Sequence, residues 1–149
     1  MDRFPHMRRA LELAQAAADA GEVPVGAVIT GPDGAVLAEA QNAMRASQDP
    51  TAHAEMLAIR AACARLGRER LVGCALYVTL EPCPMCAAAI SAARIARLYY
   101  AASDPKSGGV AQGPRVFSHP QAHHVPEIYD GICAGEAQAL LQAFFAARR

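Results

Sequence analysis

The segment ALYVTLEPCPMCAAAISAA, residues 75–93, decides the fold because it changes from a strand pattern to a helix pattern within a few residues. Aliphatic, aromatic and β-branched residues fill Ala75–Leu80, which predicts a strand. Pro82 marks the change, and the alanine-rich run from Cys83 to Ala93 predicts a helix. A strand that leads directly into a helix puts the residues between them at the edge of a sheet, where α/β proteins usually bind ligands.

The residues before this segment predict two helices and a strand hairpin. Apolar residues at helical spacing indicate the helices, which we expect to end at Gly21 and Gly67. The run Gly31-Pro32-Asp33-Gly34 is typical of a turn between two strands. In order, we expect a helix over Met7–Ala20, strands over Val23–Thr30 and Ala35–Glu39, a loop over Gln41–Pro50, and a helix from an N-cap at Thr51 to Leu66.

The residues after it predict a fourth strand over Arg97–Ala101, a loop with some helix over Asp104–Pro120, and a final helix over Glu136–Ala147. On that last helix we expect a buried side made of Leu140, Leu141, Phe144 and Phe145. The order of elements predicts an α/β fold, with a mixed central sheet flanked by helices on both faces in three α/β/α layers.

Composition is that of a globular protein, with 149 residues, 53% of them hydrophobic and 19% charged. We expect one domain, residues 1–149. The net charge of zero argues against broad affinity for polyanions. Five cysteines without an export signal do not indicate a disulfide framework, and no stretch is apolar enough to span a bilayer. We therefore expect a cytoplasmic protein with reduced thiols and no membrane partner.

Four residues in two short motifs carry chemistry: His53, Glu55, Cys83 and Cys86. Each has a simpler interpretation when taken alone. The cysteines share a helix face and could be core residues, metal ligands or a redox dithiol. A single histidine at a helix start is usually structural or solvated, and a glutamate there is a favourable charge near the positive end of the helix dipole.

The combination favours a zinc site. One imidazole and two thiolates would hold the ion with three protein ligands and leave one position for water, as in catalytic zinc sites. Two thiolates weaken the acidity of the ion towards that water, so a carboxylate such as Glu55 is useful as the proton acceptor. The pattern H-x-E followed by P-C-x-x-C is the known signature of zinc-dependent base deaminases.

From Met7 to Arg149 the chain resembles the bacterial tRNA-specific adenosine deaminases, which convert the wobble adenosine of an anticodon to inosine. Six segments carry the resemblance: Glu22–Val28, Asp49–Glu55, Leu76–Cys83, Ala92–Ile95, Asp104–Gly108 and Phe144–Arg149. The resemblance implies a cytidine deaminase fold, hydrolysis by zinc-activated water, one Zn²⁺ per subunit, an anticodon stem-loop as partner, and a homodimer with active sites near the interface.

Residue by residue, the resemblance implies that His53, Cys83 and Cys86 bind zinc and that Glu55 shuttles protons. It also implies a set of substrate contacts: Asn42, Ala54, Asp104, Lys106, Phe144, Phe145 and Arg149. We further expect Pro24, Val25 and the loop of Asn42 to form the wall of the base pocket.

Two other functions remain open at this point. A deaminase of guanine, cytosine or a free nucleoside would use the same zinc apparatus. A zinc-stapled interaction module without activity would need a fourth protein ligand, for which the candidates are Cys63, Cys74, His119, His123 and His124.

Overall fold

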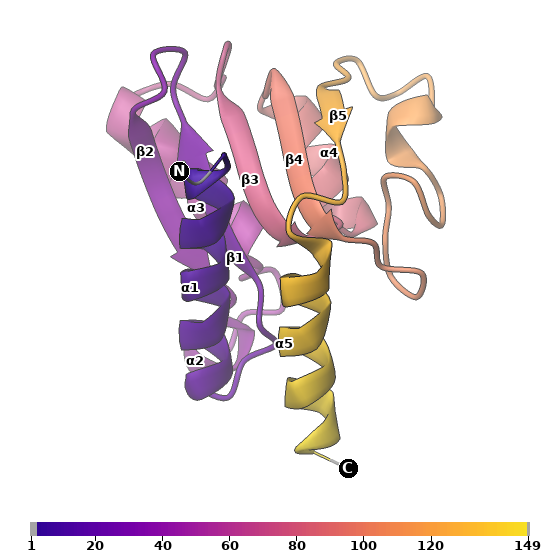
Figure 1. The fold of residues 1–149 in the computed structure, drawn as a ribbon. Coiled ribbons are helices and arrows are strands. Elements are labelled where there is room, and N and C mark those ends of the chain that lie inside the picture. The colour runs from indigo at the N-terminus through magenta and orange to yellow at the C-terminus, as the bar shows by residue number, and fades with distance from the viewer. Residues whose placement is uncertain (1–2, 149) are drawn as a thin grey trace.

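The computed structural model describes residues 3–148, which form a five-stranded sheet between two layers of helices (Figure 1). The elements are α1 Pro5–Asp19, β1 Gly26–Thr30, β2 Val36–Gln41, α2 Met44–Ser47, α3 Ala54–Leu66, β3 Ala75–Leu80, α4 Pro84–Ala92, β4 Arg97–Ala102, the 3₁₀ helix η1 Val116–Ser118, β5 Glu127–Tyr129 and α5 Ala134–Ala146. None of the helices within this range combines the length and the apolar character that crossing a membrane requires.

The sheet is mixed, in the order β2-β1-β3-β4-β5. β1 pairs antiparallel with β2 and with β3, while β3, β4 and β5 run parallel. The parallel neighbours β3 and β4 are joined by a crossover through α4, as parallel pairs require. Because they run in the same direction, the residues that follow them emerge at the same edge of the sheet.

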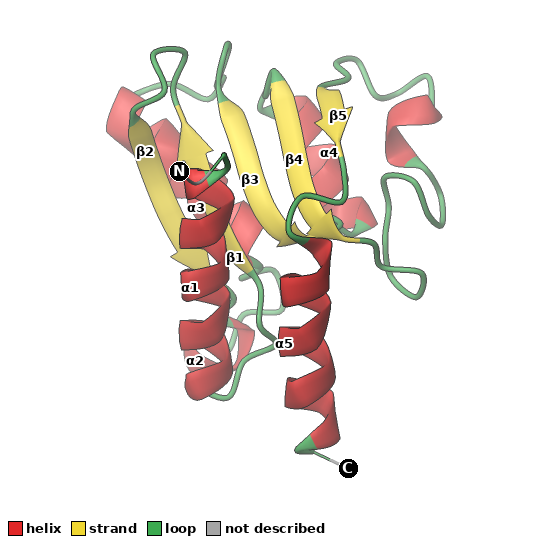
Figure 2. Cartoon of the chain, in the orientation of Figure 1, coloured by secondary structure: helices red, strands yellow, loops and turns green. Residues whose placement is uncertain are grey.

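Each face of the sheet is covered by its own pair of helices: α1 and α5 on one face, α3 and α4 on the other (Figure 2). β1 shows how both cores are filled, because successive side chains of a strand point to opposite faces. Ala27 and Ile29 lie in the core under α3 and α4, whereas Val28 lies in the core under α1 and α5. The predicted α/β fold with helices on both faces is therefore confirmed.

α1 packs directly on the backbone of β1, and a glycine makes this possible. A Cβ atom at Gly26 would lie 2.0 Å from the carbonyl oxygen of Ala10 and 2.8 Å from the backbone nitrogen of Ala14. A side chain at this position would force the helix away from the sheet.

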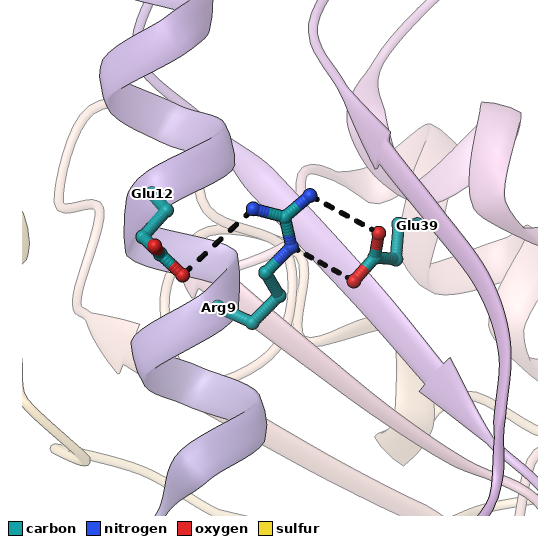
Figure 3. A network of polar contacts seen from close by, with 3 residues as sticks. All are labelled: Arg9, Glu12 and Glu39. Carbon is teal, nitrogen blue, oxygen red and sulfur yellow. Dashed lines mark hydrogen bonds and ion pairs between the residues drawn. The ribbon is translucent and has the colours of Figure 1, made fainter.

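A surface network also joins α1 to the edge strand β2 (Figure 3). The Arg9 guanidinium donates to both carboxylate oxygens of Glu39, at 2.9 Å and 3.2 Å, and lies 3.8 Å from Glu12. These bonds raise the pKa of Arg9. All three side chains are solvated, so the network orients α1 against β2 more than it stabilises the fold.

Several local expectations are wrong. The loop expected over Gln41–Pro50 contains the end of β2 and the short helix α2, Met44–Ser47. Helix α3 begins at Ala54 with His53 at its N-cap, and Thr51 is not the N-cap. The backbone N–H and the hydroxyl of Thr51 both donate to the Asp49 carboxylate, at 2.8 Å and 2.7 Å, which holds residues 49–51 in a turn before the helix. The fifth strand, Glu127–Tyr129, was not expected. It has three exposed residues, too few for a periodic pattern, and forms only because β4 offers an edge.

Candidate active site

Two helix starts bring three ligand-type side chains together. His53 is the N-cap of α3, Cys83 is the N-cap of α4, and Cys86 lies in the first turn of α4. Pro84 suits the first helical position because its missing N–H would have no partner there. The ligand atoms of the three residues all lie within 4.8 Å of one another.

The dimensions of this cluster fit a tetrahedral zinc ion. The Nδ1 atom of His53 lies 3.7 Å from the Cys83 sulfur and 3.5 Å from the Cys86 sulfur. Zinc binds nitrogen at about 2.0–2.1 Å and sulfur at about 2.3 Å, so a tetrahedral angle separates the two ligand atoms by roughly 3.6 Å. The cluster already has this spacing.

The protonation states also favour metal binding. A hydrogen bond from the Cys86 thiol and the nearby imidazole lower the pKa of Cys83 to about 4, although burial opposes the shift. The same hydrogen bond, together with burial, raises the pKa of Cys86. Cys83 in turn raises the pKa of His53. The site therefore holds a thiolate at neutral pH, and the thiolate is the form that binds metals.

Glu55 lies beside the cluster and is only 4% exposed. Burial raises its pKa to about 7, although its own backbone N–H and the charge of His53 act in the other direction. A carboxyl group with this pKa can both accept and donate a proton near neutral pH. Among residues 3–148 its carboxylate does not join the three-ligand cluster, and neither do Cys63, Cys74 or the histidines of the 118–125 segment.

Asn42, twelve residues before Ala54 in the sequence, accepts a hydrogen bond from the first residue of α3. Its side-chain oxygen accepts the backbone N–H of Ala54 at 2.8 Å, and its side-chain nitrogen donates to the carbonyl of Val23 at 3.1 Å. Asn42 thus does what the expected cap Thr51 does not. The bond engages the backbone N–H of Ala54, and the contact of Ala54 with the base stays a prediction.

A cavity of about 140 Å³ adjoins the cluster and Glu55. Its wall includes Val25 and Asn42, as expected, but Val23 takes the place expected for Pro24. The backbone N–H of Val25 donates to the carbonyl of Val23 at 2.9 Å, so a tight turn precedes β1, and both valines line the cavity. A second hollow of about 310 Å³ shares part of this wall and extends the cavity towards α5.

The remaining candidates lie around the outer hollow. Asp104 and Lys106 line it, and the Asp104 carboxylate accepts the backbone N–H of Lys106 at 3.2 Å. On α5 the expected buried side is wrong for Phe145, which is 47% exposed, whereas Phe144 is 8% exposed and Leu140 and Leu141 pack against the core. Adjacent helical residues point about 100° apart, so Phe145 lies at the edge of the buried side that Phe144 occupies. Phe145 therefore borders the hollow. Arg149 lies outside the described residues.

Two buried carboxylates at this site have no role in the sequence analysis. Glu22 accepts the backbone N–H groups of Arg45 and Ala46, and Glu81 accepts five donors from the segment after β4. Burial alone would raise the pKa of Glu81, but its backbone hydrogen bonds outweigh that effect and lower it. One signal was present in the sequence, since Glu81 is a charged residue between a buried strand and a metal motif.

A mixed sheet with this ligand set, a buried carboxyl group and an adjoining cavity defines the class of zinc-dependent deaminases. Residues 3–102 match the family model described as the cytidine and deoxycytidylate deaminase zinc-binding region. Over 148 residues the chain is 52% identical to the tRNA-specific adenosine deaminase of Agrobacterium fabrum, covering 99% of this chain and 97% of that protein. The chain therefore belongs to the bacterial tRNA-specific adenosine deaminases within this zinc-binding family.

Solved structures agree with this assignment. A structure from a study of A-to-I editing by tRNA:A34 deaminases at the wobble position has a TM-score of 0.91 and 53% identity, covering 93% of this chain and all of that one. The guanine deaminase of Bacillus subtilis has a TM-score of 0.68 and 37% identity, covering 99% of this chain and 94% of that one. The family model and the cluster together indicate zinc as the metal.

Proposed function

We propose that this protein hydrolyses the wobble adenosine of a tRNA anticodon to inosine, with His53, Cys83 and Cys86 as ligands of one Zn²⁺ per subunit and Glu55 as the proton shuttle. The observation that carries the proposal is a pair of adjoining hollows beside Glu55, whose walls share Val23, Leu80, Asp104 and Ser107. The inner hollow is lined by the ligand residues His53 and Cys83, and the outer hollow is bordered by Lys106 and Phe145. A free base needs only the inner hollow, whereas an RNA loop can also use a cation and an exposed aromatic ring.

The metal, Glu55, Asn42 and the cavity walls have separate roles in the proposed reaction. Zinc in this ligand set lowers the pKa of water and so makes a nucleophile available at neutral pH. Glu55 accepts the proton that water loses and delivers it to the adenine ring nitrogen beside C6. It then accepts the second proton, from the hydroxyl group now on C6, and delivers it to the amino group, so that the C6–N bond breaks, ammonia leaves and C6 becomes a carbonyl. The side-chain nitrogen of Asn42 has two hydrogens and uses one for Val23, which leaves one for an acceptor atom of the base. The buried walls keep other water away from the reacting carbon.

The substrate follows from the shape of the site. A base inside the inner cavity has to leave its stack, and this costs least in a single-stranded loop. An anticodon loop meets that condition. A protein with zero net charge also needs local contacts of this kind, since it has no broad electrostatic attraction to RNA.

Inosine mapping tests the proposal. Purified protein is incubated with an anticodon stem-loop that has adenosine at the wobble position, and with a control loop in which that adenosine is moved by one position. We expect inosine at the wobble position only. Ammonia release from guanine or cytidine, with none from the stem-loop, would instead support a deaminase of a free base or nucleoside. This second candidate is considered because the chain is similar to the Bacillus subtilis guanine deaminase.

The metal ligands have their own test. Cys83→Ala and Cys86→Ala variants should each lose zinc in elemental analysis, whereas Cys63→Ala should keep it. Full zinc content in either of the first two variants would remove that residue from the ligand set.

The assembly and its setting complete the proposal. From the resemblance to the family, we propose that residues 1–149 form a single deaminase domain, that two subunits associate with their active sites near the interface, and that the protein works in the cytoplasm, where its tRNA substrate is. Sedimentation velocity with and without the stem-loop would test the dimer.

A further inference from the structure

The carboxylate of Glu81 is the point to which the segment after β4 is attached. The side chain is only 2% exposed and accepts five hydrogen bonds from residues 103–112. One oxygen accepts the Ser103 hydroxyl at 3.2 Å and the Asp104 N–H at 3.0 Å. The other oxygen accepts backbone N–H groups at 3.1, 2.9 and 3.0 Å, from Val110, Ala111 and Gln112.

The segment closes tightly around this carboxylate. A Cβ atom at Gly108 would lie 2.6 Å from the carboxylate carbon of Glu81, and equally close to the carbonyl oxygen of Asp104. Only a glycine allows the chain to pass here without moving Glu81 or Asp104. The backbone N–H of Gly109 also donates to the carbonyl of Pro82 at 2.8 Å, directly before the metal motif.

Glu81 lines the inner cavity, yet it is not arranged as a second acid or base. Its two oxygens have about four lone-pair positions, and five donors already occupy them. Glu55, in contrast, is buried and has few hydrogen-bond donors around its carboxylate. The two carboxylates near the metal cluster therefore have different roles.

We infer that Glu81 is a positioning residue for the RNA substrate: its single carboxylate sets the distance between the metal motif and the segment Asp104–Ser107. Glu81 stands two residues before Cys83 in the chain, while Asp104 and Ser107 line the same cavity from the other side. The inference rests on the proposed function, because it assigns to this segment a contact with the anticodon loop.

The Glu81→Gln substitution would release one end of the segment selectively. An amide has one acceptor oxygen, and that oxygen would turn towards the three N–H groups of residues 110–112. Its NH₂ group would then face Ser103 and Asp104. The Ser103 hydroxyl can rotate and accept a hydrogen bond, but the Asp104 N–H cannot, so Asp104 would lose its partner.

Steady-state kinetics on the wobble-adenosine stem-loop test the inference. Glu81→Gln should raise KM by about ten- to a hundredfold, the effect of losing one hydrogen bond to a charged group, with kcat near that of wild type and zinc retained. Gly108→Ala, which puts a methyl group against the same carboxylate, should change KM in the same direction. Combining Glu81→Gln with Lys106→Ala should raise KM no further than Glu81→Gln alone, because both act through one segment.

Several results would overturn the inference: an unchanged KM in both variants, effects of Glu81→Gln and Lys106→Ala that multiply fully, or loss of zinc with a fall in kcat at constant KM. The last result would mean that Glu81 acts through the metal motif alone.

Hydrogen exchange separates this inference from the proposed function. In Glu81→Gln the amides of Asp104 and its segment should exchange faster, while those of Arg45 and Ala46, held by Glu22, stay protected. The matched variant Glu22→Gln should give the opposite pattern. If wild-type protein fails to deaminate the stem-loop, the proposed function is wrong; if the Asp104 amide exchanges at the wild-type rate in Glu81→Gln, the role of Glu81 is wrong.

Discussion

Asn42→Ala should destabilise the protein although it removes a loop residue. Asn42 is 5% exposed and satisfies two backbone groups, the N–H of Ala54 and the carbonyl of Val23. Ala54 is fully buried, so its N–H would have no replacement partner, whereas Val23 is partly exposed and its carbonyl keeps the bond from the Val25 N–H at 2.9 Å.

The magnitude follows from these two losses. A buried group without a partner costs about 1–3 kcal/mol, and the partly exposed one costs less. We therefore expect the free energy of unfolding to fall by about 2–3 kcal/mol, and Tm by roughly 5–10 °C for a domain of this size.

Urea denaturation followed by far-UV circular dichroism, with zinc at saturation, measures this change. Gln48→Ala is the matched control, because it removes an exposed amide at the C-cap of α2, six residues from Asn42, and should change stability by less than about 0.5 kcal/mol. Equal unfolding free energies for Asn42→Ala and Gln48→Ala would show that the hydrogen bond from Ala54 to Asn42 does not stabilise the start of α3.

Three further predictions concern other parts of the molecule. Glu55→Gln should lower kcat on the stem-loop by about 10²–10⁴-fold with full zinc in elemental analysis, and a variant that turns over normally would exclude the proton-shuttle role. Gly26→Ala should cost about 1–3 kcal/mol of unfolding free energy in thermal melts, because the added methyl group meets the carbonyl of Ala10; an unchanged Tm would contradict that contact. Burial raises the pKa of Tyr100 to about 12, so the folded state keeps its proton while the unfolded chain loses it above about pH 10. Stability should therefore fall between about pH 10 and pH 12 by up to about 1.4 kcal/mol per pH unit, and denaturant titrations of Tyr100→Phe should lack this part of the slope.

The parts of the site that were predictable are those that depend on residue types and short spacing. Cys83 and Cys86 stand three positions apart, so any helix there brings their sulfurs to one face. His53 and Glu55 belong to a motif of three residues. The central strand β3 was predicted with its observed bounds because its residues are continuously apolar or β-branched.

The parts that were not predictable depend on partners far away in the chain. Thr51 has the side chain of a good N-cap, but its bonds to Asp49 hold residues 49–51 in a turn, and Asn42 supplies the bond to Ala54 instead. β5 has no pattern of its own and exists only as a pair with β4. Phe145 is apolar by type, yet its neighbour Phe144 takes the buried side of α5.

The amino-acid sequence by itself determined which chemical groups are present and which of them share a turn: the thiols, the imidazole and the carboxyl group of a zinc-dependent deaminase. Only the tertiary structure decided that the two motifs meet, that Glu55 is buried, and that Glu81 attaches the segment after β4 beside them. The physical reason is that local torsional preferences and hydrophobic periodicity act over a few residues. Hydrogen bonds between distant residues form only after the sheet and its two helical layers have packed.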